Sequence, residues 1–196
     1  MPIRLNSTGG GAVTITAPYT ASTYTLTAPT VTANLITDSA NSITQSMMST
    51  GLAGTGPAFS VYLGTNQSVT SSTWIKAQLA SEVFDTASCY DNATNYRFTP
   101  NVAGYYQING SIYHNYTASA GVRIGTSIYK NGSSYSEQQI TNAGYSLYGT
   151  ITVSSLIYLN GTTDYVELWG INYSASAQFY GSQVLSYFNG AMMRAA

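Results

Sequence analysis

From residue 58 onward, apolar residues alternate with Ser, Thr, Asn and Gly in short runs, and Gly, Pro or Asn residues separate these runs. A period of two predicts β-strands with one buried face. The best helical pattern in the chain, at residues 38–48, is short. We expect strands at residues 58–63, 74–79, 96–99, 105–113, 122–129, 148–159, 164–172, 177–180 and 187–193.

The residues between these runs support the same interpretation. Asn131-Gly132 follows the run at 122–129, and Asn-Gly is the strongest short signal for a β-hairpin. A second pair, Asn160-Gly161, ends the run at 148–159. Roughly eight to ten strands within ~140 residues predict an all-β sandwich or jelly roll.

Residues 1–56 have a different pattern. Val13-Thr14-Ile15 and Tyr24-Thr25-Leu26 each precede a proline, which ends a strand because it cannot donate to the ladder. The segment has too little apolar area to offset the entropy of its own ordering, about 1–2 kcal/mol per residue. We therefore expect it to be an extended anchor that intertwines with identical copies or docks on another protein. A Gly-rich linker at the end of this anchor, which spans residues 1–56, would separate it from a domain at 57–196. The anchoring residues would be Leu5, Val13, Ile15, Tyr24 and Leu26.

Charged residues make up only 7% of the chain, and the net charge is −1. No basic run suits nucleic-acid binding, and no apolar stretch approaches the ~18–20 residues of a membrane span. The 18 Tyr residues argue against disorder. Because so little charge leaves little repulsion against association, the composition is compatible with a surface sealed in a permanent assembly.

The single cysteine, Cys89, excludes an intrachain disulfide, and we expect a free thiol. The N-terminus lacks the apolar core of a signal peptide. We therefore expect the protein to be made and assembled in a cytoplasm.

Residues 90–106 contain Tyr90-Asp91, a turn, Phe98-Thr99, then Gly104 and paired tyrosines. This stretch resembles a signature of the globular head of the first complement component, a family structurally allied to tumour necrosis factor. The runs at 58–63, 128–132, 159–168 and 187–192 resemble further strands of that family, in order, so the resemblance covers about residues 57–196.

The resemblance implies a jelly roll of about ten strands that forms a tight homotrimer and binds through surfaces and loops, without catalysis. The residues it implies for the core and the trimer interface are Phe98, Gly104, Tyr106, Ile108, Trp169, Phe188 and Gly190. Residues 5–18 resemble a Thr-rich, Gly-Gly-Gly segment at the start of phage virion proteins, and residues 82–86 and 97–100 resemble the phage-borne variant of the domain. The absence of a collagen-like Gly-x-y repeat argues against an animal extracellular role.

Few residues suit catalysis or metal binding. His114 is the single histidine, and no nucleophile and orienting carboxylate can be assigned to it, so we expect it on the surface or anchoring a loop. Asp85 and Asp91 flank one turn and are the candidates for calcium, although such carboxylates more often accept hydrogen bonds from turn amides. We expect no cofactor and no enzymatic activity.

Tyrosines in the predicted loops and strand ends suit stacking on sugars, which makes a host-cell surface glycan a further candidate partner. These residues are Tyr113, Tyr116, Tyr135, Tyr145, Tyr148, Tyr173 and Tyr180. Core or interface packing is the more usual role of strand tyrosines.

The leading hypothesis is a trimeric phage virion structural protein on the particle surface, either a capsid head fibre or decoration protein or a short fibre. Residues 1–56 would bind other virion proteins, and the knob would project. One alternative is a tail-fibre adhesin that recognises host glycan. A second is a secreted lectin-like or cytokine-like binding module.

Overall fold

The computed structural model describes residues 13–15, 24–26, 56–115, 121–141 and 149–196. The chain divides into two compact units, Met1–Met47 and Met48–Ala196. In the first unit, β1 (Val13–Ile15) and β2 (Tyr24–Leu26) form an antiparallel pair that places Val13 opposite Leu26 and Ile15 opposite Tyr24. The two short segments that precede prolines in the sequence are therefore strands that pair with each other. Leu5, the short helical pattern at 38–48 and all but the end of the predicted linker lie outside the described residues. The boundary near residue 56 therefore stays a prediction.

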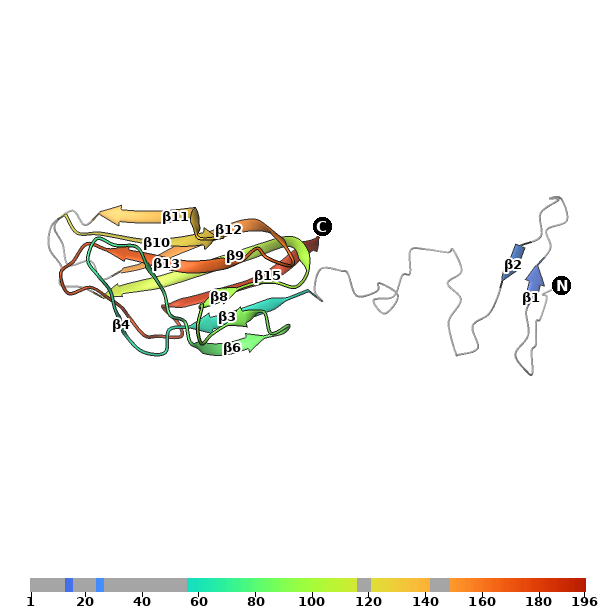
Figure 1. Ribbon diagram of the computed structural model, residues 1–196, viewed down its shortest axis with the longest axis horizontal. Helices are drawn as coiled ribbons and strands as arrows, with labels where there is room; N and C mark the ends of the chain where they lie inside the picture. The colour runs from blue at the N-terminus through green and yellow to red at the C-terminus, as the bar shows by residue number, and fades with distance from the viewer. Residues whose placement is uncertain (1–12, 16–23, 27–55, 116–120, 142–148) are drawn as a thin grey trace, which may run out of the picture. The chain divides into compact units, whose positions relative to one another are not determined.

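The second unit is a sandwich of two antiparallel sheets, and the part of it that the structure describes contains no helix (Figure 1). The seven-stranded sheet has the order β4-β14-β9-β15-β3-β6, with β12 on the other side of β9. Its strands are β3 (Ala58–Tyr62), β4 (Gln67–Ser68), β6 (Ser81–Asp85), β9 (Ala103–Asn115), β12 (Gly149–Asn160), β14 (Gln178–Phe179) and β15 (Tyr187–Ala195).

The six-stranded sheet has the order β11-β10-β13-β8-β7, and β5 also pairs with β13. Its strands are β5 (Ile75–Lys76), β7 (Tyr90–Asp91), β8 (Arg97–Phe98), β10 (Arg123–Lys130), β11 (Ser133–Thr141) and β13 (Val166–Asn172).

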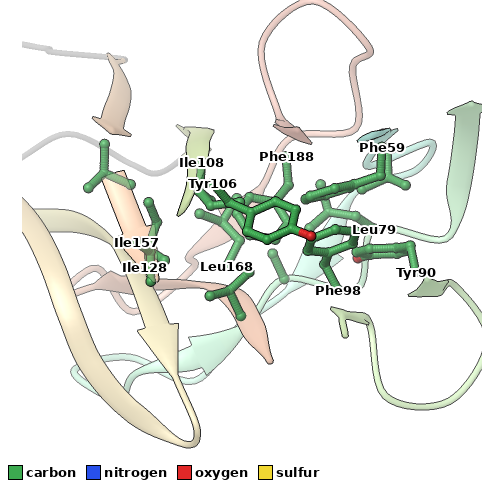
Figure 2. Packing of buried hydrophobic residues seen from close by; sticks show 14 of the residues in the cluster. Phe59, Leu79, Tyr90, Phe98, Tyr106, Ile108, Ile128, Ile157, Leu168 and Phe188 are labelled. Atoms are coloured by element: carbon green, nitrogen blue, oxygen red, sulfur yellow. The ribbon is translucent and has the colours of Figure 1, made fainter. Parts of the chain in front are cut away.

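The core lies between the sheets because alternate residues of each strand point inward. On β9 these are Tyr106, Ile108 and Ile112, which are almost completely buried. Aromatic rings fill the space beside them, and Phe59 stacks on Phe98 with the ring centroids 4.3 Å apart. Figure 2 shows these rings together with Tyr106 and Phe188 in one continuous cluster.

The predicted strands correspond to observed ones, with shifted ends. The run at 74–79 contributes only two residues, Ile75–Lys76. Four strands have no counterpart in the prediction, namely β4, β6, β7 and β11. The largest of these, β11, is exposed along most of its length. With no buried face to enforce alternation, its residues carry no period-two signal.

The two Asn-Gly pairs have different roles. Asn131 and Gly132 both have positive φ, 52° and 80°, and connect the paired residues Lys130 and Ser133, which is the hairpin that the sequence predicts. The second pair leads from β12 in one sheet to β13 in the other. There the Asn160 side-chain oxygen accepts hydrogen bonds from three successive backbone N–H groups of residues 162–164, so this turn is held by a side chain and not by strand pairing.

Candidate functional site

The outward surface of the seven-stranded sheet, hereafter the seven-stranded face, is made by alternate residues of β9 and its neighbours. Tyr105, Gln107 and Asn109 point away from the core because Tyr106 and Ile108 point into it. The register aligns Tyr105 with Tyr158 on β12, and their rings are 5.5 Å apart. The strand that supplies the centre of the core thus also supplies the centre of this face.

Most of the large apolar side chains that are exposed on strands lie on this face. Each of them is between 41% and 54% exposed: Val83, Phe84, Tyr105, Leu156, Tyr158 and Met193. In the rest of the described strands, only Tyr135 and Ile140 on β11 are large, apolar and comparably exposed. Exposed apolar side chains that gather on one face are typical of surfaces that contact another molecule.

Two β-bulges contribute to the patch. The β3–β6 register shifts between Ser60 and Val61, so that Ser60 faces Phe84 and Val61 faces Glu82. Val83 is the extra residue, and it lines a hollow in the seven-stranded face while Phe84 lines another. A similar shift in the β15–β9 pair leaves Met193 as an extra residue, exposed beside the buried Met192. The bulges thus place side chains on the outward surface that would point into the core if the strands alternated strictly.

The two sheets differ sharply in charge. Strands β3, β9 and β12 contain no Asp, Glu, Lys or Arg, whereas every strand of the six-stranded sheet contains at least one. Both ion pairs among the described residues lie on or beside the six-stranded sheet. They join Lys76 to Glu167 at 2.6 Å and Lys130 to Asp164 at 3.1 Å. The seven-stranded face therefore combines exposed apolar side chains with a nearly uncharged centre.

Amide and hydroxyl side chains connect the middle of this face. Gln107 Nε2 donates to Ser154 Oγ at 2.8 Å, and Ser154 Oγ donates to Asn109 Oδ1 at 2.8 Å. Asn109 Nδ2 in turn donates to Asn189 Oδ1 on β15 at 3.1 Å. The three amide side chains, Gln107, Asn109 and Asn189, line a hollow of about 340 Å³ together with Phe84 and other residues. A second hollow of about 260 Å³ lies beside Val83.

A third hollow, of about 500 Å³, is lined by Tyr113, Asn115, Tyr180 and Leu185. The rings of Tyr113 and Tyr180 meet edge to face with centroids 5.4 Å apart. The lining consists of aromatic, aliphatic and amide side chains and has no charged group. It suits an uncharged ligand with apolar faces and hydroxyl groups.

The structure places the predicted core and interface residues mainly inside one chain. Phe98, Tyr106, Ile108 and Phe188 have no accessible surface and belong to the chain's own core. Side chains without accessible surface cannot touch a second copy, so contact between copies has to come from other residues.

The two predicted glycines have a related role. Gly104 and Gly190 are buried where strands pack closely, and a Cβ at Gly190 would lie 2.5 Å from Ile108 Cδ1. They allow close packing within the chain. Trp169, by contrast, lies outside the core cluster and is half-buried, because it alternates with the buried Leu168 and so points outward from the six-stranded sheet.

Trp169 is part of a polar and aromatic cluster on that sheet. Its indole N–H donates to Glu167 at 2.9 Å, and its ring stacks on Tyr129 with centroids 4.6 Å apart. The Glu167 side chain is only 4% exposed and pairs with Lys76. Both oxygens of the buried Glu167 carboxylate therefore have a partner, Lys76 for one and Trp169 for the other.

The two calcium candidates accept hydrogen bonds from the turns they flank. Asp85 accepts from the backbone of Ala87 and of Tyr90, at 3.2 and 2.6 Å. Asp91 accepts from two further backbone N–H groups and from the Asn95 side chain, and these bonds lower its pKa to about 2. Across the residues that the structure describes, no three His, Cys, Asp or Glu side chains are grouped as a metal site would require.

His114 is not on the surface, contrary to the expectation from sequence. It is completely buried between the sheets, against Phe179 and 3.3 Å from Thr126 Oγ1. Desolvation lowers its pKa to about 3. The free thiol of Cys89 is also buried, and desolvation raises its pKa. Burial of this kind removes both groups from contact with a substrate.

Sequence reasoning missed the residues that give the seven-stranded face its character, in particular Gln107, Asn109, Leu156 and Asn189. Their signal in the sequence is the lack of charge in β3 and in the two longest strands, β9 and β12, which is visible only once the strands are assigned to sheets. In the described part of the chain, no helix has the length and apolar character that crossing a membrane requires.

No known family model matches the chain, and no curated protein is similar to it in sequence. The fold is similar to solved structures of tumour-necrosis-factor-like proteins. Murine APRIL at pH 5.0 has a TM-score of 0.53 and 10% identity, over 70% of this chain and 98% of that one. Eiger TNF from S. frugiperda has a TM-score of 0.50 and 13% identity, over 72% and 95%. PRD1 vertex protein P5 is 18% identical over 70% and 97%, but its TM-score of 0.49 supports no conclusion. The second unit therefore has the jelly-roll fold of tumour-necrosis-factor-like proteins, as the sequence predicts.

Proposed function

We propose that this chain is a structural protein of a bacteriophage particle, in which residues 57–196 form a homotrimeric knob on the surface and residues 1–56 anchor it to other virion proteins. The observation that carries the proposal is the seven-stranded face, with its exposed apolar side chains and uncharged centre. Permanent interfaces are rich in aromatic and Met side chains and poor in charge. The function is therefore assembly and display, not catalysis.

Self-association through this face is supported by its extent. Exposed apolar residues occur on β6, β9, β12 and β15, so they span the sheet from edge to edge. Obligate interfaces commonly bury about 2,000 Å² or more, and a whole sheet surface can provide such an area. The fold is compatible with this arrangement, since jelly-roll sandwiches bury one sheet face and leave the other free.

The virion assignment is supported by the N-terminal segment. Residues 5–18 resemble the start of phage virion proteins, and β1 pairs with β2 into a short hairpin. A two-stranded hairpin is marginal by itself in water, so we expect it to be stabilised by docking on a partner. A capsid head fibre or decoration protein would dock it on capsomers, and a short fibre would dock it at the tail.

The first experiment measures the mass of the full chain by native mass spectrometry, for the wild type and for Leu156→Asp. We expect a trimer for the wild type and a monomer for the variant, because an unpaired charge buried in an interface costs several kcal/mol. Tyr135→Asp is the matched control, since Tyr135 is similarly exposed, 51% against 54%, but lies on the other sheet. A monomeric wild type, or a trimeric Leu156→Asp, would contradict the proposal.

A second experiment addresses location. Antibodies raised against residues 57–196 should label the surface of intact phage particles in negative-stain electron microscopy. The same particles must contain the chain by peptide mass spectrometry. Particles that contain the chain but show no surface label would argue against a projecting knob.

Glycan recognition by a tail-fibre adhesin is a second candidate function, and the hollow at Tyr113 and Tyr180 supports it. Aromatic faces beside an amide suit a neutral sugar ring, whose C–H face stacks while its hydroxyl groups form hydrogen bonds. Tyr180→Ala should abolish binding on a glycan array. The secreted lectin-like or cytokine-like module is also compatible with the fold, and the absence of the chain from purified particles by peptide mass spectrometry would favour it.

A further inference from the structure

The hydrogen-bonded amides in the middle of the seven-stranded face have a fixed direction. Gln107 Nε2 lies 3.5 Å from the Ser155 carbonyl oxygen, which can only accept, so Gln107 presents its nitrogen on this side. The same nitrogen lies 3.2 Å from Asn109, whose atom there must be Oδ1. Asn109 therefore turns its nitrogen toward Asn189, which must accept through Oδ1. Each orientation determines the next.

This chain of hydrogen bonds, hereafter the amide ladder (Gln107, Asn109, Ser154, Asn189), ends in unused groups. Both ends of the Asn109 amide are occupied. Among the described residues, Asn189 Nδ2 has no acceptor and Gln107 Oε1 has no donor. The ladder thus presents a donor at one end and an acceptor at the other.

Water satisfies these two groups in an isolated chain, but burial of the face removes that water. A buried donor or acceptor without a partner is costly, so whatever covers the face must supply an acceptor for Asn189 and a donor for Gln107. A closed trimer brings different surfaces of neighbouring copies together. Such an interface can join a donor from one copy to an acceptor from the next. The two ends of the ladder suit this arrangement, because one end offers a donor and the other an acceptor.

We propose that the amide ladder sets the register of the trimer: neighbouring copies supply the acceptor for Asn189 Nδ2 and the donor for Gln107 Oε1. The inference rests on the proposed self-association of the seven-stranded face. The hollow of about 340 Å³, lined by the three amides together with Phe84 and Met193, gives a neighbouring side chain room to reach them. Apolar contacts then provide the affinity, and the ladder selects one arrangement over sliding alternatives.

The test replaces the amide nitrogen of the Asn189 side chain by an oxygen. Asn189→Asp keeps the size and shape of the side chain and the acceptor for Asn109, but replaces the outward N–H groups by an oxygen that cannot donate. We expect the full-length variant to dissociate at least tenfold more readily for each interface, a cost of at least about 1.4 kcal/mol, because the lost donor and the added charge both act at the buried face. Asn101→Asp is the control, because it adds the same charge at an exposed turn position outside the face. Sedimentation over a dilution series measures the equilibrium, and circular dichroism measures the fold.

The outcomes separate the two proposals. A stable wild-type trimer with a weakened Asn189→Asp trimer and an unchanged control supports the ladder. Equal dissociation of wild type and Asn189→Asp overturns the ladder and leaves self-association intact. A monomeric wild type overturns both proposals. If Asn189→Asp does not fold, hydrogen exchange of the Asn189 side-chain amide in the wild-type trimer decides: protection by NMR supports the ladder, and exchange at the rate of free solvent overturns it.

Discussion

Because His114 is buried, we expect the free energy of unfolding of this protein to fall at mildly acidic pH. It is the single histidine of the chain, and its Nδ1 atom has no hydrogen-bond partner among the described residues. Desolvation lowers its pKa from 6.5 to about 3 in the folded chain. The folded state therefore holds His114 neutral at pH values where the unfolded chain binds a proton.

The sign and the size follow from linkage. Below pH 6.5 the unfolded state gains a proton that the folded state rejects, so the free energy of unfolding falls as the pH decreases toward 3. At pH 5 the loss is about 2 kcal/mol, or ~1.4 kcal/mol for each pH unit below 6.5. The carboxyl pKa values of Asp91 and Asp164 are lowered by hydrogen bonds, and such groups reduce stability only at a lower pH, near the ordinary carboxyl range. Between pH 7 and 5, the change in the free energy of unfolding therefore reports the protonation of His114.

Urea denaturation at pH 7, 6 and 5 and one fixed protein concentration measures the effect. The wild type should lose about 2 kcal/mol across the interval. His114→Gln carries no titrating group at this position and should unfold with nearly the same free energy at all three values. An equal pH dependence in both proteins would show that some other group controls it, and the account of His114 would be wrong.

Two further predictions concern stability. Lys76→Met removes the partner of the buried Glu167 carboxylate, 2.6 Å away, and should reduce the free energy of unfolding by about 3–5 kcal/mol. Adding Glu167→Gln to that variant should restore part of the loss in urea denaturation, and no recovery would argue against the uncompensated charge as the cause. Gly161→Ala and Gly121→Ala both place a side chain at positive φ, but a Cβ at Gly161 would lie 2.3 Å from the Ala103 nitrogen, whereas a Cβ at Gly121 has no neighbour within 4 Å. We expect thermal unfolding to show a cost of about 1 kcal/mol at Gly121 and a clearly larger one at Gly161, and equal costs would refute the role of the close backbone contact.

The sequence alone determined the fold class and much of the strand list, because alternation is a local property. Wherever a strand has one buried face, as in β3, β9 and β12, its residues alternate with a period of two that can be recognised in the sequence. The Asn131-Gly132 hairpin could be predicted for a similar reason, since two adjacent residues at positive φ define it. Strands with two exposed or irregular faces, such as β11, left no such pattern.

The tertiary structure decided which sheet each strand joins, and with it the character of the two faces. Ser60, Asn109, Ser154 and Asn189 are far apart in sequence and come together only through strand pairing. Alternation could not separate a core residue such as Phe98 from an outward one such as Trp169, because both are apolar members of strands. It also could not tell that His114 points inward. Burial is set by what packs on a side chain from the other sheet, and that information is contained in no single stretch of the sequence.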